Sequence, residues 1–302
     1  MFADLHADTF YKCFEYDFDF SDNRLHINQN NSRKITPYIQ TFAHYIPECV
    51  ENKFDYFKKM LEKSLEIIEN TESLVLFKNI LDIQKAEKEN KTLAVLSVEG
   101  GNFFKQDSFE NLKIINFLES NYIRFFSLCY NNGSNLCGGA YSPENQGFSQ
   151  AGLKIANSLC EHNIFVDVSH LNHKSTMDVL NTNLKVIATH SNCYSICKNR
   201  RNLSDCAIIK LIEKDSLIGI NLYAPFVSDT DANLHALLKH INHIKSFGGS
   251  KNIAFGCDFD GCDDFVVGFD SLTSVYSLYD KIDEPDAMFY NNIKNFLINK
   301  FK

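Results

Sequence analysis

The sequence predicts an α/β protein whose fold is a single (β/α)8 barrel of the TIM type. Three observations support this prediction. Short apolar segments typical of strands alternate with helical segments along the chain, and eight of them can be counted. A length of 302 residues suits one such barrel. No internal repeat, low-complexity tract or linker rich in proline and glycine marks a boundary, so we expect one domain over residues 1–302, with terminal helices from about residue 270.

The predicted strands are short, largely apolar runs bounded by polar or glycine-containing segments. They cover residues 2–6, 73–77, 92–98, 122–128, 164–168, 184–189, 216–222 and 252–257. The third run, TLAVLSV, is almost continuously apolar, as expected for a parallel strand that is buried on both faces.

The predicted helices lie between these strands, where apolar residues recur every three or four positions. They cover residues 35–70, 80–90, 109–120, 149–162, 174–180, 204–214 and 231–247. A polar, glycine-rich loop fills residues 130–147. Strand and helix therefore alternate as a barrel requires.

The overall charge argues against a nucleic-acid partner. The chain has 38 acidic and 30 basic residues, a net charge of -8, and no basic run with interleaved aromatic residues. The composition is that of a globular protein, with 44% hydrophobic and 23% charged residues. A small-molecule substrate is therefore the expected partner.

The ten cysteines are scattered and form no CxxC pair. Several lie in apolar runs, where a free thiol behaves as a small buried hydrophobic group, and this usage suits a reducing compartment. The amino terminus has no features of a secretory leader, and no segment approaches the ~18 apolar residues of a membrane span. We therefore expect a cytoplasmic protein that does not contact a membrane.

Acidic and imidazole side chains stand at the ends of five predicted strands. In the opening stretch MFADLHAD, the two-residue period of a strand places His6 and Asp8 on the same face. The strands of a barrel end at one mouth, where the active site lies. The complete set at that mouth is His6, Asp8, Glu99, His170, His190 and Asp258.

Three imidazoles and three carboxylates at one mouth suit a borderline divalent ion such as zinc. Each residue alone is more typical of an ordinary loop, so the prediction depends on their joint occurrence. The simplest arrangement places His6 and Asp8 on one ion, His170 and His190 on a second, and Glu99 between the two. Asp258 is then left to transfer protons.

Other candidate ligands fit this pattern less well. The remaining histidines lie in predicted loops and helices. The pairs Cys193 with Cys197, and Cys257 with Cys262, lack a second closing pair, so we interpret them as structural thiols.

Eight short motifs carry a resemblance to a known family. They are DLHADT at 4–9, SVEGG at 97–101, GFSQAG at 147–152, VDVSH at 166–170, ATHSN at 188–192, RRNLSD at 200–205, GINLY at 219–223 and GCDFDG at 256–261. In this order, they resemble the membrane or renal dipeptidase family of zinc peptidases, a branch of the metal-dependent amidohydrolase superfamily.

The resemblance implies a metallo-dipeptidase with two Zn2+ ions bridged by Glu99, using the ligands given above. It implies that Arg201 binds the carboxylate of a dipeptide, because its planar fork suits that group. It also implies that Asp258 is the general acid and base for a metal-bridging hydroxide. A homodimer is a further expectation from the family.

One position departs from the family pattern. Where family members often carry a histidine that polarises the substrate carbonyl, this chain has Tyr130. A tyrosine hydroxyl can donate a similar hydrogen bond but carries no positive charge. Asparagines that could compensate are Asn131, Asn132 and Asn135.

Two alternatives remain open at this stage. One is a related binuclear hydrolase that acts on another amide, a lactam or an ester, which the tyrosine favours. The other is a catalytically silent barrel that binds metal, although no predicted ligand is missing.

Overall fold

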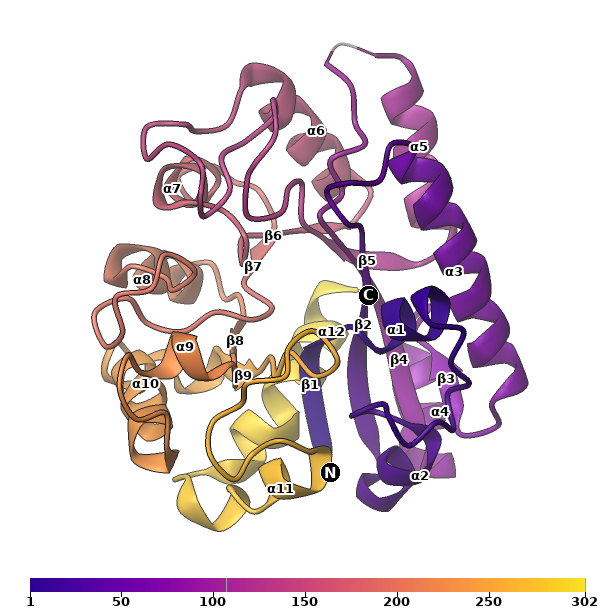
Figure 1. Cartoon of the computed structure of the whole chain (residues 1–302), viewed down its shortest axis with the longest axis vertical. Coiled ribbons are helices and arrows are strands. Elements are labelled where there is room, and N and C mark those ends of the chain that lie inside the picture. The colour runs from indigo at the N-terminus through magenta and orange to yellow at the C-terminus, as the bar shows by residue number, and fades with distance from the viewer. Residues whose placement is uncertain (107, 302) are drawn as a thin grey trace.

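The structure, a computed structural model, describes residues 1–106 and 108–301. Parallel strands form a barrel that is surrounded by helices (Figure 1). Eight of them follow one another around the barrel in the order β7, β6, β5, β4, β2, β1, β9 and β8. The strands are β1 (Phe2–Ala7), β2 (Tyr38–Tyr45), β3 (Leu74–Leu76), β4 (Thr92–Glu99), β5 (Ile123–Phe126), β6 (Phe165–Asp167), β7 (Val186–Ile187), β8 (Ile218–Ile220) and β9 (Ile253–Phe255).

The barrel closes between β7 and β8 through a short parallel bridge that joins Ala188 to Ile218. The amide of Gly219 donates to the carbonyl of Ala188 at 2.8 Å. The backbone segments approach one another closely here, and a Cβ atom on Gly219 or on Gly256 would lie 1.9 Å from the carbonyl oxygen of Thr189. Glycine is therefore required at both positions. The predicted (β/α)8 barrel is confirmed.

Two segments differ from the sequence prediction. The segment 35–70 was expected to be helical throughout, but Tyr38–Tyr45 forms strand β2, and the helix begins only at Lys53. β2 pairs with β1 and β4, and seven of its eight residues are buried. A strand buried on both faces shows no two-residue alternation, so its pattern cannot be separated from that of a helix. The predicted strand at 73–77 exists as β3 but pairs only with β4, outside the eight-strand path.

The remaining predicted helices are present, with ends shifted by a few residues. The α-helices are α1 (Thr9–Glu15), α2 (Gln29–Ser32), α3 (Lys53–Asn70), α4 (Ile80–Glu89), α5 (Glu110–Ser120), α6 (Gln150–Glu161), α7 (His173–Leu180), α8 (Asp205–Glu213), α9 (Ala224–Val227), α10 (Leu234–Ser246), α11 (Leu272–Tyr276) and α12 (Asn292–Lys300). In the described part of the chain, no helix is both long and apolar enough to span a membrane. All ten cysteines are free thiols.

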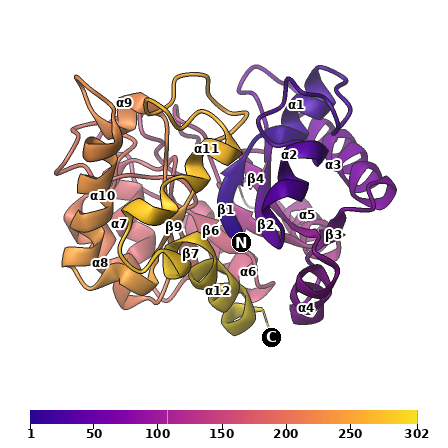
Figure 2. The ribbon, with the colours of Figure 1, turned by 90° about the horizontal axis from the view of Figure 1, so that it is seen from below.

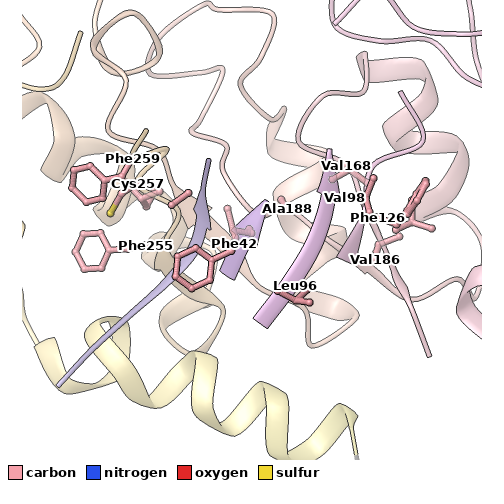
Figure 3. Packing of buried hydrophobic residues seen from close by; sticks show 14 of the residues in the cluster. Phe42, Leu96, Val98, Phe126, Val168, Val186, Ala188, Phe255, Cys257 and Phe259 are labelled. Carbon is pink, nitrogen blue, oxygen red and sulfur yellow. The ribbon is translucent and has the colours of Figure 1, made fainter. Parts of the chain in front are cut away.

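The apolar core has two parts. The larger part includes Phe42, Val98 and Phe255, which are labelled in Figure 3 with other residues of this cluster. The smaller part joins strand residues such as Leu5 and Phe125 to Phe296 of α12. Figure 2 shows α12 and both chain ends at one end of the barrel, with α1 and α9 at the opposite end. The C-terminal ends of the strands are therefore left free for a functional site.

His44 in β2 is a buried histidine outside that site. Its Nδ1–H donates to the carbonyl of Ser97 at 2.8 Å, and its Nε2 lies 3.0 Å from the hydroxyl of Ser64. Burial lowers its pKa to about 4, so the ring is neutral in the folded protein. Because the unfolded chain binds a proton near pH 6.5 and the folded chain does not, stability is full above that pH and falls as the pH drops toward 4.

We expect this histidine to make the protein acid-sensitive. Between about pH 7.5 and pH 5, the metal-free protein should lose about 2 kcal/mol more unfolding free energy than its His44→Gln variant does. Urea unfolding at both pH values measures the difference. The exposed His235→Gln variant should behave like the unaltered protein. If the unfolding free energy of the His44→Gln variant depends on pH as strongly as that of the unaltered protein, His44 is not the buried neutral group described here.

Candidate active site

The structure brings together the six residues predicted at the strand ends. His6 lies in β1 and Asp8 follows it, and Glu99 ends β4. His170, His190 and Asp258 follow β6, β7 and β9. The five predicted metal ligands are between 1% and 6% exposed. Their side chains thus meet at the C-terminal mouth of the barrel, as the fold class predicts.

Glu99 stands between two groups of the predicted metal ligands. Its Oε2 lies 3.1 Å from Nε2 of His6, and that nitrogen is 3.3 Å from Oδ2 of Asp8. Its Oε1 lies 2.6 Å from Nε2 of His170. The Nε2 atoms of His170 and His190 are 2.9 Å apart. One carboxylate therefore faces both groups, which is the arrangement that a bridging ligand needs.

The buried charges fit a metal-binding role. Oδ1 of Asp8 is buried and has no hydrogen-bond partner among the described residues. Burial, followed by the charge of Glu99, raises the pKa of Asp8. Burial also lowers the pKa of His190, which keeps this ring neutral, the form that binds a metal. Imidazole nitrogens and carboxylate oxygens are donors that suit a metal ion such as zinc. Two groups of such atoms lie close enough together to hold an ion, namely His6, Glu99 and His190, and His6, Asp8 and Asp258.

Neighbouring residues orient the two imidazoles of the second group. Nδ1–H of His190 donates to the hydroxyl of Thr189 at 2.8 Å, and that hydroxyl donates to Asp167. Nδ1–H of His170 donates to Oδ1 of Asn131 at 3.0 Å. Both rings therefore turn an unprotonated Nε2 into the site, where the two nitrogens lie 2.9 Å apart. A hydrogen bond of this kind is the usual support of a metal-binding histidine.

The guanidinium of Arg201 reaches the same pair of histidines. Its Nη2 lies 3.0 Å from Nε2 of His170 and 2.9 Å from Nε2 of His190. A cationic group thus contacts both nitrogens, as a bound cation would. The other terminal nitrogen, Nη1, is buried without a hydrogen-bond partner among the described residues, and the residue is 4% exposed.

Asp258 differs from the five predicted ligands in its exposure, since 16% of its side chain is accessible. Its Oδ2 accepts a hydrogen bond from the side-chain amide of Asn221 at 2.9 Å, and its Oδ1 lies 3.8 Å from Nε2 of His6. A Cβ atom on Gly261 would lie 2.3 Å from Asp8 and 2.6 Å from Asp258. A glycine is therefore needed beside these two carboxylates.

A cavity of about 500 Å³ opens above this cluster. Tyr130 lies on its wall, and the ring stacks on His170 with centroids 4.4 Å apart. Burial, followed by the charge of Glu99, raises the pKa of Tyr130, so its hydroxyl stays neutral and able to donate. Asn131 lines the cavity as well as holding His170, whereas Asn132 and Asn135 do not line it.

Sequence reasoning missed several cavity residues, namely Tyr45, Tyr141, Tyr223, Phe226, Asp263 and Asp264. Most of them lie in loops and helices whose paths depend on tertiary contacts. Tyr223 is different, because it ends the GINLY segment directly after β8. Its place after a strand end was a usable signal.

Comparison with known proteins identifies the family of this chain. The family described as membrane dipeptidase, peptidase family M19, matches residues 1–298. An uncharacterized dipeptidase of Schizosaccharomyces pombe is 26% identical over 293 residues, 89% of this chain and 69% of that protein. An uncharacterized Klebsiella pneumoniae protein encoded in the pqqA 5′ region is 29% identical over 121 residues, 38% of this chain and 45% of that protein.

Solved structures share the fold. The dipeptidase AC, a metallopeptidase of family M19, has a TM-score of 0.88 at 19% identity, with 99% of this chain and 98% of that chain covered. A Rhodobacter sphaeroides metallopeptidase, liganded with a phosphinate mimic of the dipeptide L-Ala-D-Ala, has a TM-score of 0.87 at 18% identity, with 100% and 99% covered. Since the family match spans nearly the whole chain, this protein belongs to the membrane dipeptidase family, peptidase family M19.

Proposed function

We propose that the protein is a zinc-dependent dipeptidase with two ions per chain. The observation that carries the proposal is that one oxygen of Glu99 contacts His6 and the other contacts His170. This carboxylate lies beneath a cavity that is also lined by Arg201. Within the metallopeptidase family, this set of nitrogen and oxygen donors favours zinc over a harder cation such as magnesium.

The charge distribution in the cavity suits a dipeptide. Asp258, Asp263 and Asp264 lie on its wall, and Arg201 lies there too. A dipeptide carries a free amine and a free carboxylate, so a cavity with both charges matches its two ends. The volume of about 500 Å³ falls in the range of small-ligand sites. The Rhodobacter relative, which holds a dipeptide mimic, supports the same substrate class.

The protein residues have distinct roles in this proposal. Two bound metal ions would lower the pKa of a bound water and would polarise the scissile carbonyl. Asp258 takes the proton from the attacking water and gives it to the leaving amine. Arg201 holds the free carboxylate, and its planar fork fixes the orientation of the peptide bond. The neutral hydroxyl of Tyr130 donates a hydrogen bond to the substrate's carbonyl oxygen.

The role of Arg201 leads to a prediction. The Arg201→Ala variant should lose on the order of 100-fold in kcat/KM on L-Ala-L-Ala, because a charge-assisted contact contributes about 1.5–3 kcal/mol. The kcat/KM of this variant on L-alaninamide, which lacks the carboxylate, should fall far less. Steady-state kinetics on both substrates measures the effect. Arg201→Lys should recover only part of the loss, since it restores the charge without the fork.

Tyr130 favours a second candidate, a binuclear hydrolase that acts on a neutral amide, lactam or ester. The same experiment separates the two functions. If Arg201→Ala reduces turnover of L-Ala-L-Ala and of neutral amides equally, carboxylate recognition is wrong and the second candidate is favoured. If the protein turns over neutral amides faster than any dipeptide, the conclusion is the same.

A further inference from the structure

A second cavity lies beside the active site. Its volume is about 660 Å³, and its polar lining includes Glu144, Asn172, His173, Lys198, Arg200 and Ser204. Arg201 is the one described residue that lines both cavities. The side chain that contacts His170 and His190 therefore also borders this second space.

Two helices begin at this cavity. Asn172 caps α7 by accepting the amide of Ser175, and Ser204 caps α8 by accepting the amide of Ala207. Both capping residues line the cavity. The first turn of a helix carries a partial positive charge, so α7, which has no acidic residue in that turn, favours an anion in this space. In α8 the first turn contains Asp205, which offsets part of this effect.

The side chains add to this preference. Lys198 and Arg200 are exposed at the cavity, and no ion pair within residues 1–106 and 108–301 involves either of them. The single acidic side chain in the lining is Glu144, which is also exposed. Arg201 adds a buried guanidinium whose Nη1 has no hydrogen-bond partner in the described part of the chain. The cavity therefore has an excess of cationic groups, and the guanidinium at its border has one unpaired donor for the substrate's free carboxylate.

We propose that this cavity binds the acidic side chain of the substrate's C-terminal residue, so that dipeptides ending in glutamate or aspartate are preferred. The inference rests on the proposed dipeptidase function. The free carboxylate and the side chain of that residue leave the same Cα atom. A carboxylate held by Arg201 thus places the side chain next to the guanidinium that borders the second cavity. Lys198 and Arg200 then attract its charge.

The test compares L-Ala-L-Glu with L-Ala-L-Gln, which have nearly the same shape and differ in charge. The zinc-loaded protein should show a kcat/KM ratio of at least about tenfold in favour of the glutamate dipeptide, and the ratio should fall with added salt. In the double variant Lys198→Ala, Arg200→Ala the ratio should fall toward one. Glu144→Gln should change it in the opposite direction. Lys239→Ala, on the exposed face of α10, should leave it unchanged.

Three outcomes would overturn the inference. A ratio near one in the unaltered protein, with both dipeptides cleaved, refutes the acidic preference and leaves the dipeptidase function standing. If the ratio is high but is unchanged in both the double variant and Glu144→Gln, the preference for the acidic side chain arises outside this cavity. If no dipeptide is cleaved, both proposals fail. Glu144→Gln keeps the test decisive if the double variant does not fold.

Discussion

Replacement of Glu99 by alanine is expected to reduce dipeptide turnover by on the order of 1000-fold or more. Loss of a residue that only supports a metal ligand costs about 10–100-fold, and we propose Glu99 as a direct ligand of both ions. Its two oxygens contact His6 and His170, and no other carboxylate makes contacts with both groups among the described residues. Its loss therefore removes a donor from each proposed ion.

Two measurements check this prediction. Steady-state kinetics on L-Ala-L-Ala gives the loss in kcat/KM, and elemental analysis gives the metal content, which should fall below two ions per chain. His190→Ala should show the same pattern. Glu110→Ala, an exposed position at the start of α5, should keep full activity and metal content. Full activity in the Glu99→Ala variant would refute the metal assignment.

The Asp258→Asn variant should lose turnover without losing metal. The side chain is held by Asn221 and is more exposed to the cavity than the proposed ligands are, so it can reach a substrate. General acid and base groups contribute about 10²–10⁴-fold, and we expect kcat to fall within that range. An asparagine has nearly the same shape but cannot take or give the proton.

Paired measurements of kcat and metal content separate this role from ligation. Asp258→Asn should keep two ions per chain, in contrast to Glu99→Ala. Asp231→Asn, an exposed position that does not line the cavity, is the matched control. If Asp258→Asn loses metal in parallel with turnover, Asp258 is a ligand and not the proton carrier.

The site residues at the strand ends could be predicted from the sequence because a barrel brings the C-terminal ends of its strands to one mouth. Glu99 and His190 lie far apart in the chain, yet each follows an apolar run, and that local feature was enough to place them together. β2 was not readable, because its buried residues lack a two-residue period and a true helix, α3, follows closely.

The finer geometry of the site depends on tertiary structure. The motif RRNLSD indicated that Arg201 belongs to the site, but only the fold shows that its Nη2 contacts His170 and His190. Asn131 was expected near the substrate, and the structure also shows it orienting His170. The cavity is also lined by Tyr141, whose backbone amide donates a hydrogen bond to the carbonyl of Asn131 across the loop. No local pattern encodes such contacts.

Zinc reconstitution tests the central claim most directly. The protein is stripped of metal with a chelator, and zinc is returned stepwise while hydrolysis of L-Ala-L-Ala is followed. A binuclear dipeptidase should be inactive without metal and should reach full activity at two equivalents per chain. Undiminished turnover by the stripped protein, or two bound zinc ions without turnover of any dipeptide, would contradict the account.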